Sequence, residues 1–183
     1  MGSGLCDSCF PRRAKAGRYR DEPVPDCPFC GIVAGKNPER VIFRTERLVA
    51  FPNIRPEAAT HLLVVPAAHV RNTDVLGTDD LEMVEEMDRV GRELLAKTAP
   101  AGSELKLGYH VPPWRSIDHL HLHCMALPHS PPWAAIKYML PGVWLSSADL
   151  AARLRRRRQR PSGLLQQEGG GGGGIGAEGG AAV

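Results

Sequence analysis

The sequence predicts an α+β protein with five strands in an antiparallel sheet, a long helix after the third strand and a short C-terminal helix. Three observations support this fold class. Histidines alternate with apolar residues over residues 119–124, and a period of two is typical of a β-strand. Apolar residues recur at spacings of three and four over residues 78–99, which is typical of a helix. Strands, then a helix, then further strands favour α+β with an antiparallel sheet.

The composition predicts one folded domain at residues 27–158, between a disordered leader at 1–26 and a disordered tail at 159–183. The leader is rich in Gly, Pro, Arg and Asp, and the tail contains six consecutive glycines. Neither segment has enough large apolar residues to offset the entropy lost on ordering.

The first three strands and the long helix follow in order. Residues 41–53 read as two short strands around a charged turn, and residues 59–70 as a more buried, β-branched strand. In the helix at 78–99, Asp79 and Asp80 occupy the first turn, where the helix dipole favours acids. Its apolar positions are Leu81, Val84, Met87, Val90 and Leu94.

The last elements are two strands and a helix. Residues 104–111 read as the fourth strand and the histidine run as the fifth. Residues 146–160 read as the closing helix, with Ser146 or Ser147 as its N-cap.

Charge and hydropathy argue against two kinds of partner. The net charge is +3, yet residues 27–152 hold 12 basic and 14 acidic residues, so we do not expect a nucleic-acid-binding domain. No apolar stretch approaches the roughly 20 residues that span a bilayer. We therefore expect no membrane partner and a location in the cytoplasm and nucleus. The arginine-rich run at 153–160 is either a nuclear import signal or RNA contact, or the solvated end of a helix.

The run of His119, His121 and His123 has three interpretations. It could be an exposed edge strand without a role, although seven histidines in 183 residues rarely fall in this pattern by chance. Two imidazoles at alternate positions could hold a catalytic zinc ion. A neutral imidazole is also a good nucleophile, and flanking imidazoles can donate hydrogen bonds to a phosphate. The middle histidine suits the attacking role.

Four motifs in the same order resemble a known family. They are "CPFCGIVAGK", "LVAFPNIRP", "ATHLLVVPAAH" and "SIDHLHLHCM". The chain resembles the histidine triad (HIT) superfamily over residues 27–158. Within it, the chain is similar to the HINT subfamily, and "GYHVPP" with "WLSSADLAARL" most resembles the third branch. The resemblance implies a HIT-like fold.

The resemblance implies an adenosine 5′-monophosphoramidase, which hydrolyses the P–N bond of AMP-amine conjugates such as AMP-lysine, and acyl-adenylates. His121 would attack phosphorus and form a transient adenylyl-histidine. To do so, its other ring nitrogen should donate its hydrogen to a main-chain carbonyl. His119 and His123 would contact phosphate oxygens, and Ser116 would assist the departing amine. No cofactor is required for this catalysis.

Three further positions correspond to nucleotide-binding residues of the family. Asn53 stands where an acid normally binds both ribose hydroxyls, and a neutral amide should bind them more weakly. Ile54 would pack on the base, or alternatively into the core. His61 would pack beside the nucleophile, or serve as an ordinary hydrogen-bonded core histidine.

The loop at residues 108–118 departs from the usual HINT pattern. His110, Trp114 and Arg115 stand where many HINT proteins have a glycine-rich segment, so substrate preference does not carry over. Arg115 could bind an anionic leaving group, but a solvated loop arginine is the expected state.

The cysteines present two zinc arrangements. Some family members bind a structural zinc with residues matching Cys27, Cys30, His69 and His119, while others have no metal. The competing arrangement pairs Cys6-x-x-Cys9 with Cys27-x-x-Cys30 as a zinc ribbon, although the intervening residues offer little to pack beneath one.

Two other functions remain open on the sequence alone. One is a catalytically weak nucleotide-binding or scaffolding module, favoured by Asn53 and the altered loop. The other is a zinc-dependent hydrolase that uses the triad as ligands. Repair of adenylated DNA, as by aprataxin, is a narrower alternative that the neutral core disfavours. The resemblance also implies a homodimer, less regularly in the third branch.

Overall fold

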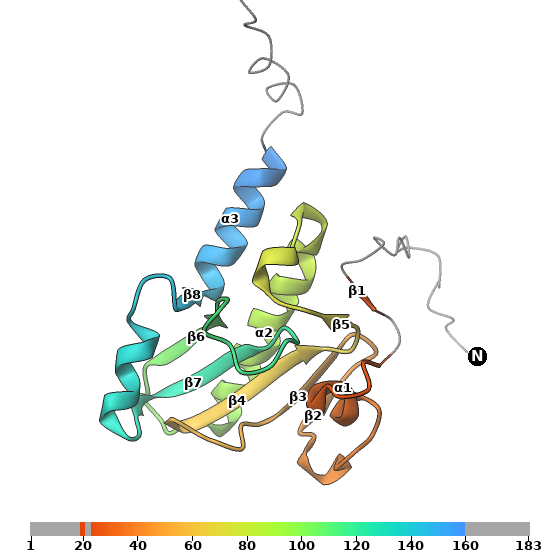
Figure 1. Cartoon of the computed structure of the whole chain (residues 1–183). Coiled ribbons are helices and arrows are strands. Elements are labelled where there is room, and N and C mark those ends of the chain that lie inside the picture. Colours follow the sequence, from red (N-terminus) through yellow and green to blue (C-terminus); the bar gives the residue numbers. More distant parts are fainter. Residues whose placement is uncertain (1–18, 21–22, 160–183) are drawn as a thin grey trace, which may run out of the picture.

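The computed structural model describes residues 19–20 and 23–159, in which a six-stranded antiparallel sheet is the central element (Figure 1). In spatial order its strands are β2 (Phe43–Arg44), β3 (Leu48–Pro52), β4 (Ala58–Pro66), β7 (Leu122–His129), β6 (Leu105–His110) and β8 (Trp144–Ser146). The helices are α1 (Pro28–Val33), α2 (Leu81–Thr98) and α3 (Ser147–Gln159). The predicted fold class is confirmed, with six strands in place of five.

The additional strand is β8, which pairs antiparallel with β6. It has three half-buried residues and runs directly into α3. A strand this short shows no alternation, which is why the sequence pattern did not separate it from the helix.

A second sheet contains two short strands. Here β1 (Tyr19–Arg20) pairs with β5 (His69–Val70). Thus two residues of the predicted leader form a strand. The described residues do not include positions 1–18 of that leader or the tail from residue 160. Cys6 and Cys9 of the possible zinc ribbon therefore lie outside the described residues.

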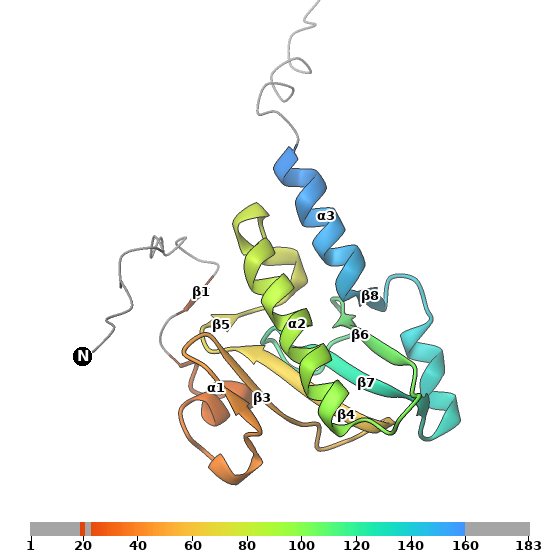
Figure 2. The ribbon, with the colours of Figure 1, turned by 180° about the vertical axis from the view of Figure 1, so that it is seen from behind.

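The two faces of the sheet have different coverings. Figure 2 shows α2 lying across one face, and the main hydrophobic core forms there. In β4, Leu62 and Val64 belong to this core, whereas Leu63 and Val65 pack with α1 in a second apolar cluster. Because side chains alternate along a strand, His61 shares the face of Leu63 and lies away from α2.

The histidine run enters the sheet later than expected. β7 begins at Leu122, so His119 lies in a bend and His121 immediately before the strand. The Leu120 N–H donates to the Val70 carbonyl at 2.6 Å. The alternation nevertheless persists, because Leu120, Leu122 and Cys124 belong to the core beneath α2. The three imidazoles are buried outside that core.

The predicted helices are confirmed. The chain enters α2 through a single 3-10 turn at Thr78–Asp80, where the Asp80 carboxylate accepts a hydrogen bond from the Gly77 N–H. The cap of α3 is Ser146, because its hydroxyl oxygen accepts from the Asp149 N–H at 3.0 Å. Within the described part of the chain, no helix is both long and apolar enough to span a bilayer.

Gly91 lies where α2 packs closely on the sheet. A Cβ atom at this position would lie 2.5 Å from Cys124 Sγ and 3.1 Å from Leu107 Cδ2. Alanine normally stabilises a helix over glycine by about 1 kcal/mol. Here we expect Gly91→Ala to lower the free energy of unfolding by about 1–3 kcal/mol, because the core would be overpacked. Urea denaturation measures this change.

A double variant provides the matched control. Cys124→Ala removes the sulfur that the new methyl group would meet, so adding it to Gly91→Ala should recover much of the lost stability. A single Gly91→Ala variant that is more stable than the wild type would contradict this close packing.

Candidate active site

His121 is held as a neutral imidazole by a main-chain hydrogen bond. Its Nδ1 lies 2.6 Å from the carbonyl oxygen of His119, so Nδ1 carries the hydrogen and donates it. Burial lowers the pKa of His121 to about 4, against the raising effect of the bond to the carbonyl. At neutral pH, Nε2 is therefore unprotonated and has a free lone pair. This is the hydrogen-bonding pattern that a nucleophilic role requires.

His123 lies next to His121, with ring centroids 4.9 Å apart. The rings of His61 and His110 also pack against it, at 5.1 and 5.0 Å. Its Nδ1 lies 2.8 Å from His61 Nε2, whereas its own Nε2 is buried and has no hydrogen-bond partner among the described residues. Burial, reinforced by the neighbouring histidines, keeps the pKa of His123 well below its ordinary value.

His119 is directed away from this pair. Its Nε2 donates to the Pro66 carbonyl at 3.0 Å, and its Nδ1 lies 3.4 Å from Cys27 Sγ and 3.5 Å from Cys30 Sγ. Both ring nitrogens are therefore engaged. This geometry does not fit the phosphate contact expected of His119.

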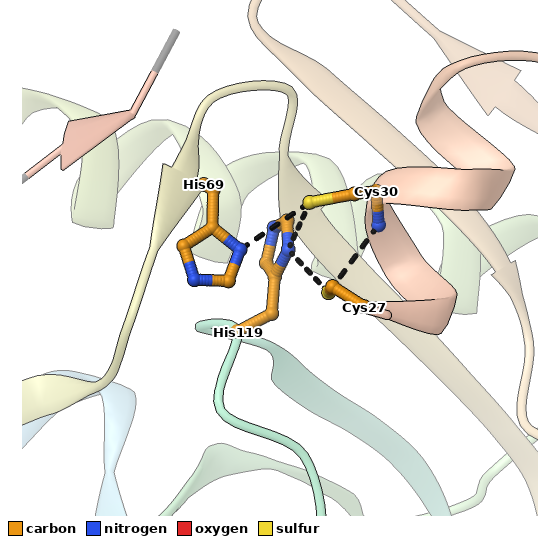
Figure 3. A group of neighbouring side chains, drawn as sticks. All are labelled: Cys27, Cys30, His69 and His119. Carbon is orange, nitrogen blue, oxygen red and sulfur yellow. Dashed lines mark hydrogen bonds between the residues drawn. The ribbon is translucent and has the colours of Figure 1, made fainter. Parts of the chain in front are cut away.

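The Cys₂His₂ cluster consists of Cys27, Cys30, His69 and His119 (Figure 3). The cysteines come from the start of α1, His69 from β5, and His119 from the segment before β7. All four are buried, and their ligand atoms lie within 4.8 Å of one another.

The cluster fits a tetrahedral metal site. Zn–S and Zn–N bonds of ordinary length place sulfur and nitrogen ligands about 3.5 Å apart. The observed separations are 3.3 Å from Cys30 Sγ to His69 Nδ1, and 3.4 and 3.5 Å from the sulfurs to His119 Nδ1. Because the Nε2 hydrogen of His119 is committed to Pro66, Nδ1 has the lone pair that a metal needs. Four protein ligands would leave no open position for substrate.

Two of the predicted nucleotide-binding residues lie beside the histidine pair. Asn53 Nδ2 is 3.2 Å from His61 Nε2, and Asn53 Oδ1 accepts from the Arg55 N–H at 3.0 Å. Ile54 is 72% exposed, which rules out core packing as its role. The structure therefore brings Asn53, His61 and His123 together and leaves Ile54 at the surface.

Ser116 makes no hydrogen bond to His121. It is exposed, makes no side-chain hydrogen bond among the described residues, and lines a cavity of about 600 Å³ with Cys27, His69 and Arg71. This cavity adjoins the Cys₂His₂ cluster, and neither His121 nor His123 lines it. The expected assistance to a leaving amine would require Ser116 to move toward the nucleophile.

The loop before the triad also differs from expectation. Arg115 is neither free to bind an anion nor solvated, because its guanidinium lies 2.8 Å from the Asp118 carboxylate and only 20% of its side chain is exposed. Asp118 also pairs with Arg71 at 3.2 Å. Trp114 lies mostly in solvent.

Several residues near the triad had no assigned role in the sequence. Tyr138 and Trp144 pack against His110 and His123, and Tyr138 donates a hydrogen bond to Glu57. Tyr138 belongs to the 3-10 helix η4 (Pro132–Tyr138), seen in cyan in Figure 1. A short 3-10 helix of this kind has no apolar periodicity by which the sequence could reveal it.

Comparison with known proteins agrees with this geometry. A family model described as "Scavenger mRNA decapping enzyme C-term binding" matches residues 26–139. A crystal structure described as a HIT family hydrolase from Legionella pneumophila has a TM-score of 0.53 and 29% identity, and the match covers 58% of this chain and 99% of that one. The chain belongs to the histidine triad superfamily.

Within the superfamily, the chain is similar to the HINT proteins. Arabidopsis thaliana HINT4, named a bifunctional adenosine 5′-phosphosulfate phosphorylase/adenylylsulfatase, is 43% identical over 114 residues, 61% of this chain and 77% of the relative. Mus musculus HINT3, named an adenosine 5′-monophosphoramidase, is 40% identical over 104 residues, 55% of this chain and 63% of the relative. The resemblance to the HINT subfamily and its third branch is confirmed.

The Cys₂His₂ cluster makes a direct prediction about metal content. We expect the purified protein to contain one zinc ion per chain by elemental mass spectrometry. Cys30→Ser should reduce this content strongly and lower the melting temperature, because metal binding contributes to folding free energy. Cys124→Ala is the matched control, since this buried cysteine faces α2. Equal zinc content in Cys30→Ser and the wild type would contradict the assignment.

Proposed function

We propose that the chain is an adenosine 5′-monophosphoramidase, which hydrolyses AMP-amine conjugates and acyl-adenylates through an adenylyl-histidine. The hydrogen bond from His121 Nδ1 to the His119 carbonyl carries the proposal, because it leaves an unprotonated Nε2. The name of the mouse HINT3 relative supports the activity. The name of the Arabidopsis relative includes an adenylyl sulfate, to which attack at the same phosphorus would apply.

The first step transfers AMP to the protein. His121 Nε2 forms a bond to the α-phosphorus, the P–N bond breaks, and the leaving amine takes a proton from solvent. The imidazole becomes positively charged as it attacks, so its Nδ1–H···O bond to His119 becomes charge-assisted and stronger. Water then attacks phosphorus and gives up a proton to solvent, the bond from phosphorus to Nε2 breaks, AMP leaves, and His121 returns to its neutral form.

His123 would stabilise charge on the phosphate. Its Nε2 is buried beside His121 and has no partner among the described residues. A hydrogen-bond donor placed in advance where negative charge develops lowers the barrier, and removing one such donor typically costs 10²–10³ in rate. The lowered pKa keeps the His123 imidazole neutral. It can therefore donate a hydrogen bond without placing a second positive charge beside His121, which becomes cationic as it attacks.

Asn53 and Ile54 would contact the nucleoside. The exposed Ile54 offers an apolar surface to the base. Asn53 Oδ1 already accepts the Arg55 N–H, so an amide with one acceptor engaged should hold the ribose less tightly than a carboxylate. His61 would support the site from beside His123.

The Cys₂His₂ cluster favours structural zinc over catalytic zinc. Its candidate ligands exclude His121 and His123. The intact histidine pair disfavours a module without turnover. A homodimer, and a location in the cytoplasm and nucleus, stay predictions.

Replacement of the nucleophile tests the proposal. We expect His121→Ala to lower kcat for an AMP-lysine analogue at least about 10³-fold, because the covalent route is lost. Tyr109→Phe, in the core beneath α2, should retain wild-type activity. The activity of both variants is measured as the rate of AMP release, which chromatography follows. Activity in His121→Ala near the wild-type rate would contradict the mechanism.

A zinc hydrolase predicts a different outcome. Its activity would fall in proportion to the zinc removed while circular dichroism still shows a folded chain. On the mechanism proposed here, any chelated protein that stays folded retains turnover.

A further inference from the structure

A main-chain hydrogen bond fixes the position of the hydrogen on His61. The peptide N–H of Glu57 donates to His61 Nδ1 at 3.1 Å. A peptide N–H can only donate, so Nδ1 must be the unprotonated nitrogen of this ring. A neutral imidazole has one N–H, which therefore lies on Nε2. Burial keeps His61 neutral by lowering its pKa to about 4.

The hydrogen on His61 determines the hydrogen on His123. His61 Nε2 lies 2.8 Å from His123 Nδ1, so His61 donates and His123 Nδ1 accepts. The N–H of His123 must then be on Nε2, the buried nitrogen that has no partner among the described residues. The Asn53 amide nitrogen lies 3.2 Å from His61 Nε2 and can only donate, so this contact is not a hydrogen bond when Nε2 carries the hydrogen that it gives to His123.

Glu57 is held in place at its side chain and its carbonyl. Lys137 Nζ lies 2.8 Å and 2.6 Å from the two carboxylate oxygens, and the Tyr138 hydroxyl donates to one of them. The Glu57 carbonyl accepts from the Ser130 N–H at 3.0 Å and from His129 Nδ1 at 3.1 Å. Burial acts to raise the pKa of Glu57, but the bonds from Lys137 and Tyr138 lower it overall, so it is ionised at neutral pH.

These contacts connect η4 to the triad. Tyr138 is 2% exposed, and its ring stacks on His129 at 4.8 Å with an interplanar angle of 7°. Tyr138 is 81 residues from Glu57 in the sequence. The short helix thus anchors the loop between β3 and β4 at the residue whose N–H reaches His61.

We propose that Glu57, Lys137 and Tyr138 form a clamp that sets the tautomer of His61 and, through it, presents His123 Nε2–H to the substrate. The three are positioning residues, since they act through His61. The effect on turnover rests on the proposed function, whereas the tautomer assignment does not. In the opposite tautomer, His123 would direct a lone pair at the phosphate oxygens and repel them.

Nitrogen-15 NMR of histidine-labelled protein at pH 7 tests the clamp, because protonated and unprotonated ring nitrogens have distinct shifts. We expect Nε2–H for both His61 and His123 in the wild type. In Glu57→Gln and Tyr138→Phe, we expect a second His123 population with Nδ1–H. We also expect kcat for an AMP-lysine analogue to fall about tenfold or more, with KM within about twofold, because the donor acts chiefly on developing charge.

Two comparisons separate positioning from general destabilisation. Tyr109→Phe also removes one tyrosine hydroxyl, but on the opposite face of the sheet, where the Tyr109 hydroxyl lies 4.0 Å from Met87 Sδ. This variant should change neither the histidine tautomers nor kcat. His61→Gln retains an amide N–H that can donate to His123 Nδ1, so it should preserve the His123 tautomer. His61→Leu should lose it.

Two results would overturn the clamp. The first is wild-type His123 carrying its hydrogen on Nδ1. The second is Tyr138→Phe and Glu57→Gln that retain both the wild-type tautomers and the wild-type kcat. Tautomers that respond as expected in a protein without phosphoramidate turnover would support the clamp and refute the proposed function.

Discussion

The hydrogen bond from His121 Nδ1 to the carbonyl of His119 is the interaction on which the site depends. It joins residues two apart in the sequence, so local backbone geometry suffices to make it. Its effect is to leave Nε2 unprotonated in a buried environment. The tautomer of the neighbouring His123 follows from that of His61, which the Glu57 N–H sets. Main-chain groups therefore determine which ring nitrogen carries the hydrogen in both imidazoles.

Because side chains alternate along the histidine run, its apolar residues and its histidines lie on opposite faces and have different roles. Leu120, Leu122 and Cys124 bind the run to the core beneath α2, which fixes the positions of the intervening histidines. On the other side, His119 joins the Cys₂His₂ cluster while His121 and His123 form the reactive pair. A metal held by that cluster would brace α1, β5 and the start of the triad together, since each supplies a ligand.

Local patterns predicted most of the fold and part of the site. The period of two at 119–124 and the apolar spacing of α2 are properties of short segments, so the sequence reveals them directly. The direction of His119 and the exposure of Ile54 depend on tertiary packing. The contact of Tyr138 with Glu57 joins residues 81 apart and could not be inferred from either segment.

The most direct measurement is the location of AMP on the protein after a single turnover. The protein is mixed with a substoichiometric AMP-amine conjugate, quenched within milliseconds under alkaline conditions that preserve phosphoramidates, and digested for tandem mass spectrometry. We expect AMP on His121. AMP attached to another residue, or rapid hydrolysis with no protein-bound AMP at any quench time, would contradict the account.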